Sequence, residues 1–138
     1  MVKFESSLVL EIPFYDLDPM NVVWHGNYVK YLEAARCEMF RQLRYTYEDM
    51  KNDGVAYPVA KMDLKFIKSC RFGQKIIVTT LLEEIEPCII IKYIITDAST
   101  GEKLLKARSM QICIDAHSGE SIHSAPVRLK EIFEECKI

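Results

Sequence analysis

The chain has 138 residues, 49% of them hydrophobic, which is enough for one domain with one core, residues 1–138. Lys and Arg total 18 against 20 for Asp and Glu, and the net charge of −2 argues against broad binding to nucleic acid or anionic membranes. The five cysteines lack a Cys-x-x-Cys pair and predict neither a disulfide framework nor a zinc site. Without a signal-peptide pattern or an apolar membrane span, we expect a soluble, cytoplasmic protein.

The first predicted element is a strand over residues 4–14, where apolar and polar residues alternate loosely. Turn-forming residues follow in the segment 14–28. Pro19 fixes its own φ and disfavours the α region for Asp18, while Asn21 tolerates a left-handed φ. We therefore expect a tight, irregular loop that holds Asp18.

The only long helical pattern follows, over residues 27–44. Its apolar residues recur at the three-and-four spacing of one helix face: Tyr28, Leu32, Ala35, Met39 and Leu43. Arg36 falls outside this stripe. Because Val29, Cys37 and Phe40 add a second apolar side, we expect the helix to be covered around much of its girth, as by a curved sheet.

The start of this helix is a candidate oxyanion site. The first backbone N–H groups of a helix have no intrahelical acceptor and carry the positive end of the macrodipole, so the amides near His25 and Gly26 attract negative charge. Gly26 also allows a ligand to approach closely. An acid such as Asp18 facing these amides, with a polarisable carbonyl between them, suits acyl transfer.

The rest of the chain predicts a short capped helical turn over residues 46–50 and then antiparallel strands joined by turns. These strands are expected over residues 59–66, 76–85, 88–95 and 103–115. The strand 88–95 is apolar on both faces, so it is either central in the sheet or covered by a partner subunit. A short helix is expected after Pro126. This order of elements is α+β.

The segment Asp16-x-Asp18-Pro19-x-Asn21-Val22-Val23-Trp24-His25-Gly26-Asn27-Tyr28 resembles the active-site segment of hotdog-fold acyl-CoA thioesterases, the group of 4-hydroxybenzoyl-CoA thioesterase and the Tol-Pal-associated thioesterases. The resemblance implies a hotdog fold, in which an antiparallel five- to six-stranded sheet wraps one long central helix. It implies a homodimer or homotetramer with sites at the subunit interface. Two departures are Asn21, where relatives usually carry Gly, and Phe14, where the Tol-Pal subgroup tends to carry Tyr.

The same resemblance implies roles for individual residues. Asp18 is the expected catalytic carboxylate, either as a nucleophile that forms a mixed anhydride or as a general base on water. The amide of His25 is expected to polarise the thioester carbonyl, with a further role for its side chain left open. Trp24 and Tyr28 are expected to border the acyl pocket, and Asp16 to stabilise the loop.

Each candidate has a structural alternative. Asp18 in a Pro turn suits an Asx-turn or a helix cap, and His25 suits a simple helix-entry position. Glu33 is expected to be a helix-surface charge that pairs with Arg36. A local basic cluster comprises Lys61, Lys65, Lys68, Arg71 and Lys75. Within it, Lys65 and Arg71 are candidates for contact with the phosphates of CoA.

The predicted activity is hydrolysis of an acyl-CoA, or of an acyl-carrier protein thioester, to a free acid and a thiol. The rivals are a hotdog hydratase or dehydratase and a non-catalytic acyl-thioester binding module. The lyases that resemble this group place acid and His closer together than Asp18 and His25. No P-loop, Rossmann glycine pattern or Gly-x-Ser-x-Gly elbow occurs, and His117 and His123 lack partners at metal-ligand spacing, so no cofactor or metal is expected.

Overall fold

The fold is α+β in a computed structural model that describes residues 4–136. The elements in chain order are β1 (Phe4–Glu11), the 3-10 turn η1 (Phe14–Asp16), α1 (Asn27–Leu43), α2 (Tyr47–Asn52), β2 (Val55–Ala56), β3 (Val59–Phe66), β4 (Lys75–Glu84), β5 (Cys88–Asp97), β6 (Lys103–Asp115), β7 (Ser121–Ile122) and α3 (Val127–Glu135). The long helix and the strands predicted from apolar periodicity are all present. None of the helices in residues 4–136 is long and apolar enough to cross a bilayer.

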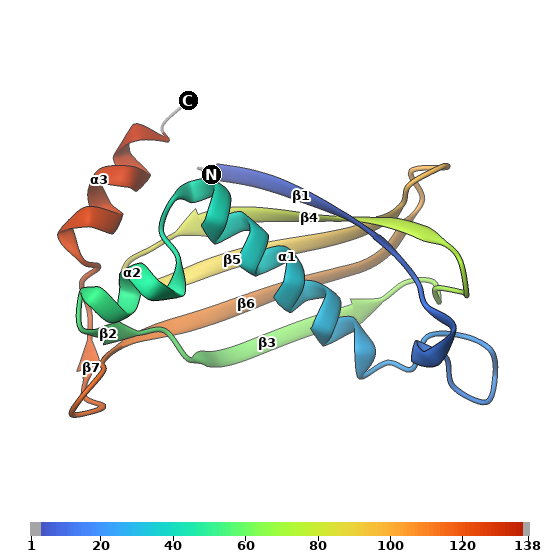
Figure 1. The fold of residues 1–138 in the computed structure, drawn as a ribbon, viewed down its shortest axis with the longest axis horizontal. Coiled ribbons are helices and arrows are strands. Elements are labelled where there is room, and N and C mark those ends of the chain that lie inside the picture. Colours follow the sequence, from blue (N-terminus) through green and yellow to red (C-terminus); the bar gives the residue numbers. More distant parts are fainter. Residues whose placement is uncertain (1–3, 137–138) are drawn as a thin grey trace.

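The sheet is antiparallel throughout, and its main strands lie in the order β1-β4-β5-β6-β3 (Figure 1). β5 lies between β4 and β6, so its two apolar faces reflect a central position in the sheet. β2 and β7 each pair with the far end of β6 and raise the sheet to seven strands. These two strands have only two residues each, too few to show an alternating pattern in the sequence.

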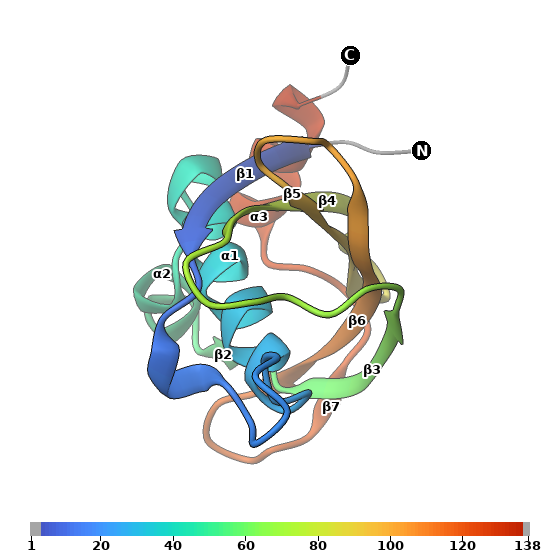
Figure 2. The ribbon, with the colours of Figure 1, turned by 90° about the vertical axis from the view of Figure 1, so that its right-hand side faces the viewer.

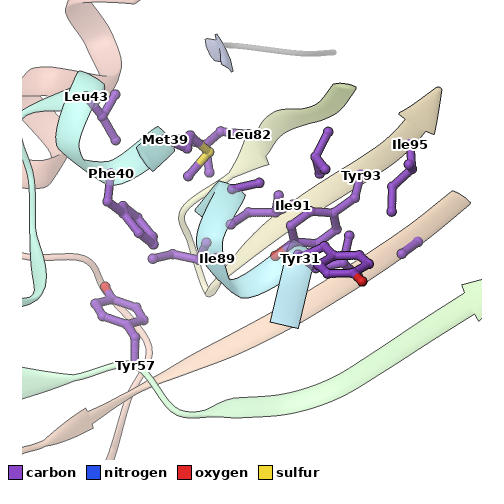
Figure 3. Close-up of a cluster of buried hydrophobic side chains, with 14 of the residues drawn as sticks. Tyr31, Met39, Phe40, Leu43, Tyr57, Leu82, Ile89, Ile91, Tyr93 and Ile95 are labelled. Carbon is purple, nitrogen blue, oxygen red and sulfur yellow. The ribbon is translucent and has the colours of Figure 1, made fainter. Parts of the chain in front are cut away.

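Helix α1 lies across one face of the sheet, which curls around it when seen from the end (Figure 2). All five residues of the predicted apolar stripe are buried. Met39 and Leu43 of α1 belong to the same cluster of buried side chains as Leu82, Ile91 and Ile95 of the sheet, which is drawn in Figure 3. Each such large apolar side chain contributes about 1.5–3 kcal/mol on burial, so this contact holds the helix in place.

Two features of α1 do not follow from its apolar pattern. Arg36 is only 4% exposed although it falls outside the apolar stripe, and its guanidinium donates to the Tyr47 hydroxyl at 3.0 Å and to Glu33. The expected ion pair of Glu33 with Arg36 is thus present. Val29 is 38% exposed and Cys37 is also exposed, so the sheet does not cover all of the second apolar side of the helix, contrary to what the sequence predicted. In the single chain, this side of α1 faces solvent.

Candidate active site

The loop between β1 and α1 is a tight irregular turn, as predicted, and it fixes Asp18. Asn21 has a left-handed φ of 62°. The backbone amide of Asp18 donates to the carbonyl of Val22 at 2.8 Å, and the amide of Asn21 donates back to the carbonyl of Asp18 at 2.9 Å. The amide of Met20 donates to Asp18 Oδ1 at 2.8 Å, an Asx-turn contact. The other oxygen, Oδ2, accepts no hydrogen bond from residues 4–136, so it is free to act on a ligand.

Asp16 joins this loop to the first turn of α1. Its carbonyl oxygen accepts from the Trp24 amide at 3.0 Å and from Asn27 Nδ2 at 2.8 Å. Its carboxylate is buried and accepts from the Tyr31 hydroxyl at 2.7 Å and from Lys30 Nζ at 3.1 Å. These four donors come from the end of the loop and the first turns of the helix. Asp16 therefore sets how the loop and the helix start lie relative to each other.

The segment that follows β3 is joined to the same helix start. The amide of Val23 donates to the carbonyl of Cys70 at 2.9 Å, and the amide of Cys70 donates to the Tyr28 hydroxyl at 3.0 Å. Burial holds the pKa of Tyr28 well above its ordinary value, and the charge of Asp18 adds to this rise. Tyr28 is thus a neutral hydroxyl near the Asp18 carboxylate.

The helix start leaves donors unused. The amides of Asn27 and Tyr28 donate to the carbonyls of Trp24 and His25, at 2.8 and 3.4 Å. No group in residues 4–136 accepts a hydrogen bond from the amides of His25 or Gly26. Since the N-terminus of a helix favours negative charge, these free amides suit a developing oxyanion.

Asp18, His25 and Tyr28 line one cavity of about 310 Å³ between the loop, the helix start and the end of β3. Its other lining residues are Met20, Val22, Val23, Phe66, Ile67, Lys68 and Ser69. Asp18 is half-buried and His25 is exposed, so the cavity is open to a ligand from solvent. Aromatic rings form part of the wall, with the Phe66 ring centroid 5.5 Å from that of Tyr28 and 6.4 Å from that of His25. The cavity can hold a small acyl thioester beside a carboxylate.

Trp24 and Gly26, predicted to contact substrate, lie beside this cavity and are not among its lining residues. The indole of Trp24 covers Gly26 so closely that a Cβ at position 26 would lie 2.3 Å from the ring. Gly26 has an ordinary helical φ of −67°, so its backbone conformation does not require glycine. Glycine is needed because the Trp24 ring fills the space that a Cβ would occupy.

The two predicted phosphate contacts do not converge. Lys65 lines a groove on the outer face of the sheet, whereas Arg71 lines a separate hollow at the turn before β4. The wall formed by Phe66 and Ile67 was missed by the sequence analysis. Its only sequence signal is a pair of large apolar residues at the end of a strand, 52% and 46% exposed in the structure. Within residues 4–136, no three His, Cys, Asp or Glu side chains gather as a metal site would require.

Comparison with known proteins shows the family of the chain. Residues 12–135 match the model of the Thioesterase-like superfamily. The chain is 27% identical to the putative acyl-CoA thioesterase YneP of Bacillus subtilis, over 93% of this chain and 89% of the relative. It is 24% identical to the acyl-CoA thioester hydrolase YbgC of Escherichia coli O157:H7, over 77% of this chain and 79% of the relative. The structure of DHNA-CoA thioesterase from Staphylococcus aureus has a TM-score of 0.85 and 26% identity, over 95% of this chain and 89% of that one, and confirms the hotdog fold.

Proposed function

The chain belongs to the thioesterase-like superfamily, and from this premise we propose that it hydrolyses an acyl-CoA thioester to a free carboxylic acid and CoA. One observation carries the proposal: Asp18, which has a carboxylate oxygen that accepts no hydrogen bond from residues 4–136, and His25, which has an unpaired amide there, line the same cavity. A thioester carbonyl placed there meets a base or nucleophile on one side and hydrogen-bond donors on the other. The relatives named above as acyl-CoA thioesterases support the same activity.

In the proposed reaction, the amide of His25 stabilises the oxyanion as the thioester carbonyl is attacked. Asp18 acts by one of two routes. It either removes a proton from the attacking water, or attacks the carbonyl itself to give a mixed anhydride that water then opens. Both routes break the carbon–sulfur bond, release the CoA thiol and add one water to the products.

The test of this proposal is Asp18→Asn. Asn keeps an oxygen that accepts from the amide of Met20, so the loop and the fold should remain intact. We expect kcat for thiol release to fall at least about a hundredfold, the size of a positioned base or nucleophile. Glu131→Gln, which removes an exposed carboxylate on α3, is the matched control and should change nothing. Near-normal kcat in a folded Asp18→Asn protein would remove Asp18 from the chemistry.

A second variant separates the backbone of His25 from its side chain. His25→Ala keeps the amide in place, so a purely backbone role predicts that most of the thiol release is retained. A large loss of kcat would instead assign the imidazole to orienting Asp18 or the thioester. The assay should include 2-enoyl-CoA, since hydration of that compound without thiol release would replace thioester hydrolysis by a lyase reaction.

We also propose that the protein acts as a homodimer or homotetramer. The outer edge of β3 pairs with no strand in residues 4–136, and Phe66 and Ile67 are exposed where β3 meets the cavity. A second subunit at this edge would bury both side chains and close the cavity. Light scattering after gel filtration measures the assembly directly, and a monomer with full activity would overturn this part of the proposal.

A further inference from the structure

A groove of about 440 Å³ lies on the face of the sheet that points away from α1, and we call it the outer groove. Tyr93 of β5 lies in the core, and Ala107 of β6 is its direct partner. Because successive strand residues point to opposite faces, the two neighbours of Ala107 in β6 point outward. These neighbours are Lys106 and Arg108, and both are exposed.

The outer groove is strongly positive, although the chain as a whole has a net charge of −2. Its lining contains five cationic side chains and one acidic one, which are Lys65, Lys92, Lys103, Lys106, Arg108 and Asp63. Lys92 forms an ion pair with Glu83 at 3.5 Å, whereas the other four cations form no ion pair within residues 4–136. Positive charge is therefore concentrated on this face, and most of it is not neutralised within the chain.

The strand register adds an independent indication of a partner. Lys65 of β3 is the direct partner of Lys106, and Lys92 of β5 is the direct partner of Arg108. Like charges directly opposite each other on neighbouring strands are destabilising. Lys106 and Arg108 lie about 7 Å apart along β6, since a strand rises about 3.4 Å per residue. Two negative charges at this spacing would relieve both repulsive pairs at once.

We infer that the outer groove binds an acidic segment of another protein. Carboxylates about 6–7 Å apart occur on every second residue of an extended segment and on every fourth residue of a helix. The half-buried side chains of Ile94 and Leu81 share this face, because they are the direct partners of Lys106 and Lys92. They give a bound segment apolar surface beside the charges. The groove therefore fits a segment that carries both acidic and apolar residues.

Two other occupants fit the groove less well. Proteins that bind single-stranded nucleic acid stack its bases on aromatic side chains, and no exposed aromatic ring of residues 4–136 lines the groove. Its one aromatic lining residue, Tyr93, is 1% exposed. A second copy of the chain would bring an identical positive groove and increase the repulsion. An acidic polypeptide has neither disadvantage.

The outer groove and the cavity of Asp18 lie on opposite faces of the sheet. Lys65 lines the groove, whereas Phe66, the next residue of β3, lines the cavity. A second subunit at the β3 edge, as proposed above, would close the path around that edge and bring a second outer groove alongside the first. A segment in the groove is therefore held away from the reacting atoms. Since the groove is complete in one chain, its binding does not depend on the proposed hydrolysis.

The first test measures binding of a fluorescent polyglutamate peptide to the full chain by anisotropy. The wild type should bind this peptide and not polyglutamine, and Lys106→Glu should weaken binding at least about tenfold, as expected when one charge-assisted contact becomes repulsive. Lys51→Glu makes the same charge change at an exposed position of α2 and is the matched control. Equal binding by the wild type and Lys106→Glu would overturn the inference. Tighter binding of a single-stranded oligonucleotide of equal charge would assign the groove to nucleic acid and overturn it as well.

The second test separates this groove from the substrate and from self-association. Free CoA should leave the peptide bound, and kcat/KM for acyl-CoA should be the same in Lys106→Glu as in the wild type. Displacement of the peptide by CoA, or a lower kcat/KM, would assign the groove to the substrate and overturn the inference. A smaller assembly of Lys106→Glu in light scattering would assign it to another copy of the chain, with the same consequence.

The third test addresses the repulsion between paired cations. Lys106→Glu places a carboxylate opposite Lys65, so it should raise the melting temperature of the protein without ligand. Lys51→Glu should leave the melting temperature unchanged. An unchanged or lower melting temperature of Lys106→Glu would refute the repulsion from which the acidic partner is inferred. None of these binding and melting measurements needs turnover, so their outcome is independent of whether the protein hydrolyses thioesters.

Discussion

The hydrogen bond between Tyr31 and Asp16 should be one of the strongest single polar contacts of the site, and Tyr31→Phe tests it. The bond is 2.7 Å long, buried, and accepted by a carboxylate whose side chain is 5% exposed. Hydrogen bonds to charged groups contribute about 1.5–3 kcal/mol, and removing the hydroxyl leaves the buried oxygen without this donor. The other donor, Lys30, is 60% exposed and adds at most about 1 kcal/mol.

We therefore expect Tyr31→Phe to lower the free energy of unfolding by about 2 kcal/mol. For a domain of this size, the melting temperature should fall by about 6–8 °C. Circular dichroism during heating measures this change, with Tyr15→Phe as the control because Tyr15 is 74% exposed. A double-mutant cycle with Asp16→Asn should show a coupling of about 1 kcal/mol.

The same variant should reduce kcat more than it raises KM, since Asp16 holds the loop of Asp18 against the helix start. Unchanged melting and zero coupling in the cycle would refute the claim that this bond fixes the site. A normal melting temperature with a large loss of kcat would also contradict it, because the same hydrogen bond is expected both to stabilise the protein and to hold the geometry of the loop.

Three further outcomes follow from the burial and contacts of individual side chains. Burial raises the pKa of Tyr45 and Tyr57 above the value of about 10 in an unfolded chain, so their contribution to stability is full below about pH 10 and is lost as the pH rises toward the folded pKa values. A tyrosinate absorbance titration should show both ionising late, together with unfolding, and their early ionisation in a folded protein would contradict this. Gly26→Ala should displace the half-exposed Trp24 ring, with a shift in tryptophan fluorescence and little change in melting temperature; an unchanged spectrum would refute the close contact. Leu32→Ala should lower the free energy of unfolding by about 2–5 kcal/mol in chemical denaturation, since the Leu32 side chain of α1 is fully buried in the core. A loss well below about 1 kcal/mol would contradict that packing.

The elements of the fold were predictable from the sequence because apolar spacing is a local signal. The α1 stripe and the alternation of β3 each lie within one short segment, and the bounds found for α1 agree with those expected within one residue. The tight loop followed from Pro19 and Asn21, whose backbone preferences are intrinsic. The position of Asp18 beside the helix start depended on the family resemblance as well, since loop residues alone do not fix the direction of a side chain.

Other features could not be predicted because they depend on contacts between distant segments. The burial of Arg36 was not predicted, because apolar periodicity says nothing of a charged residue outside the stripe, whereas its side chain is buried and donates to Tyr47. The outer groove combines cations of β3, β5 and β6 that only the strand register brings together. The sequence cluster around Lys65 included the first of these residues but none of the others.

The cavity lined by Asp18 and His25 takes all of its lining from two short stretches of chain, residues 18–28 and 66–69. None of the wall comes from β4 or β5, or from the apolar stripe of α1 beyond its first turn. Val23 and Tyr28 within these stretches belong to the core, whereas Met20, Phe66 and Ile67 are exposed. Under the proposed function, a mutant library restricted to these three exposed positions should change acyl selectivity with little effect on folding free energy, which makes this arrangement a favourable starting point for evolution in the laboratory and in nature.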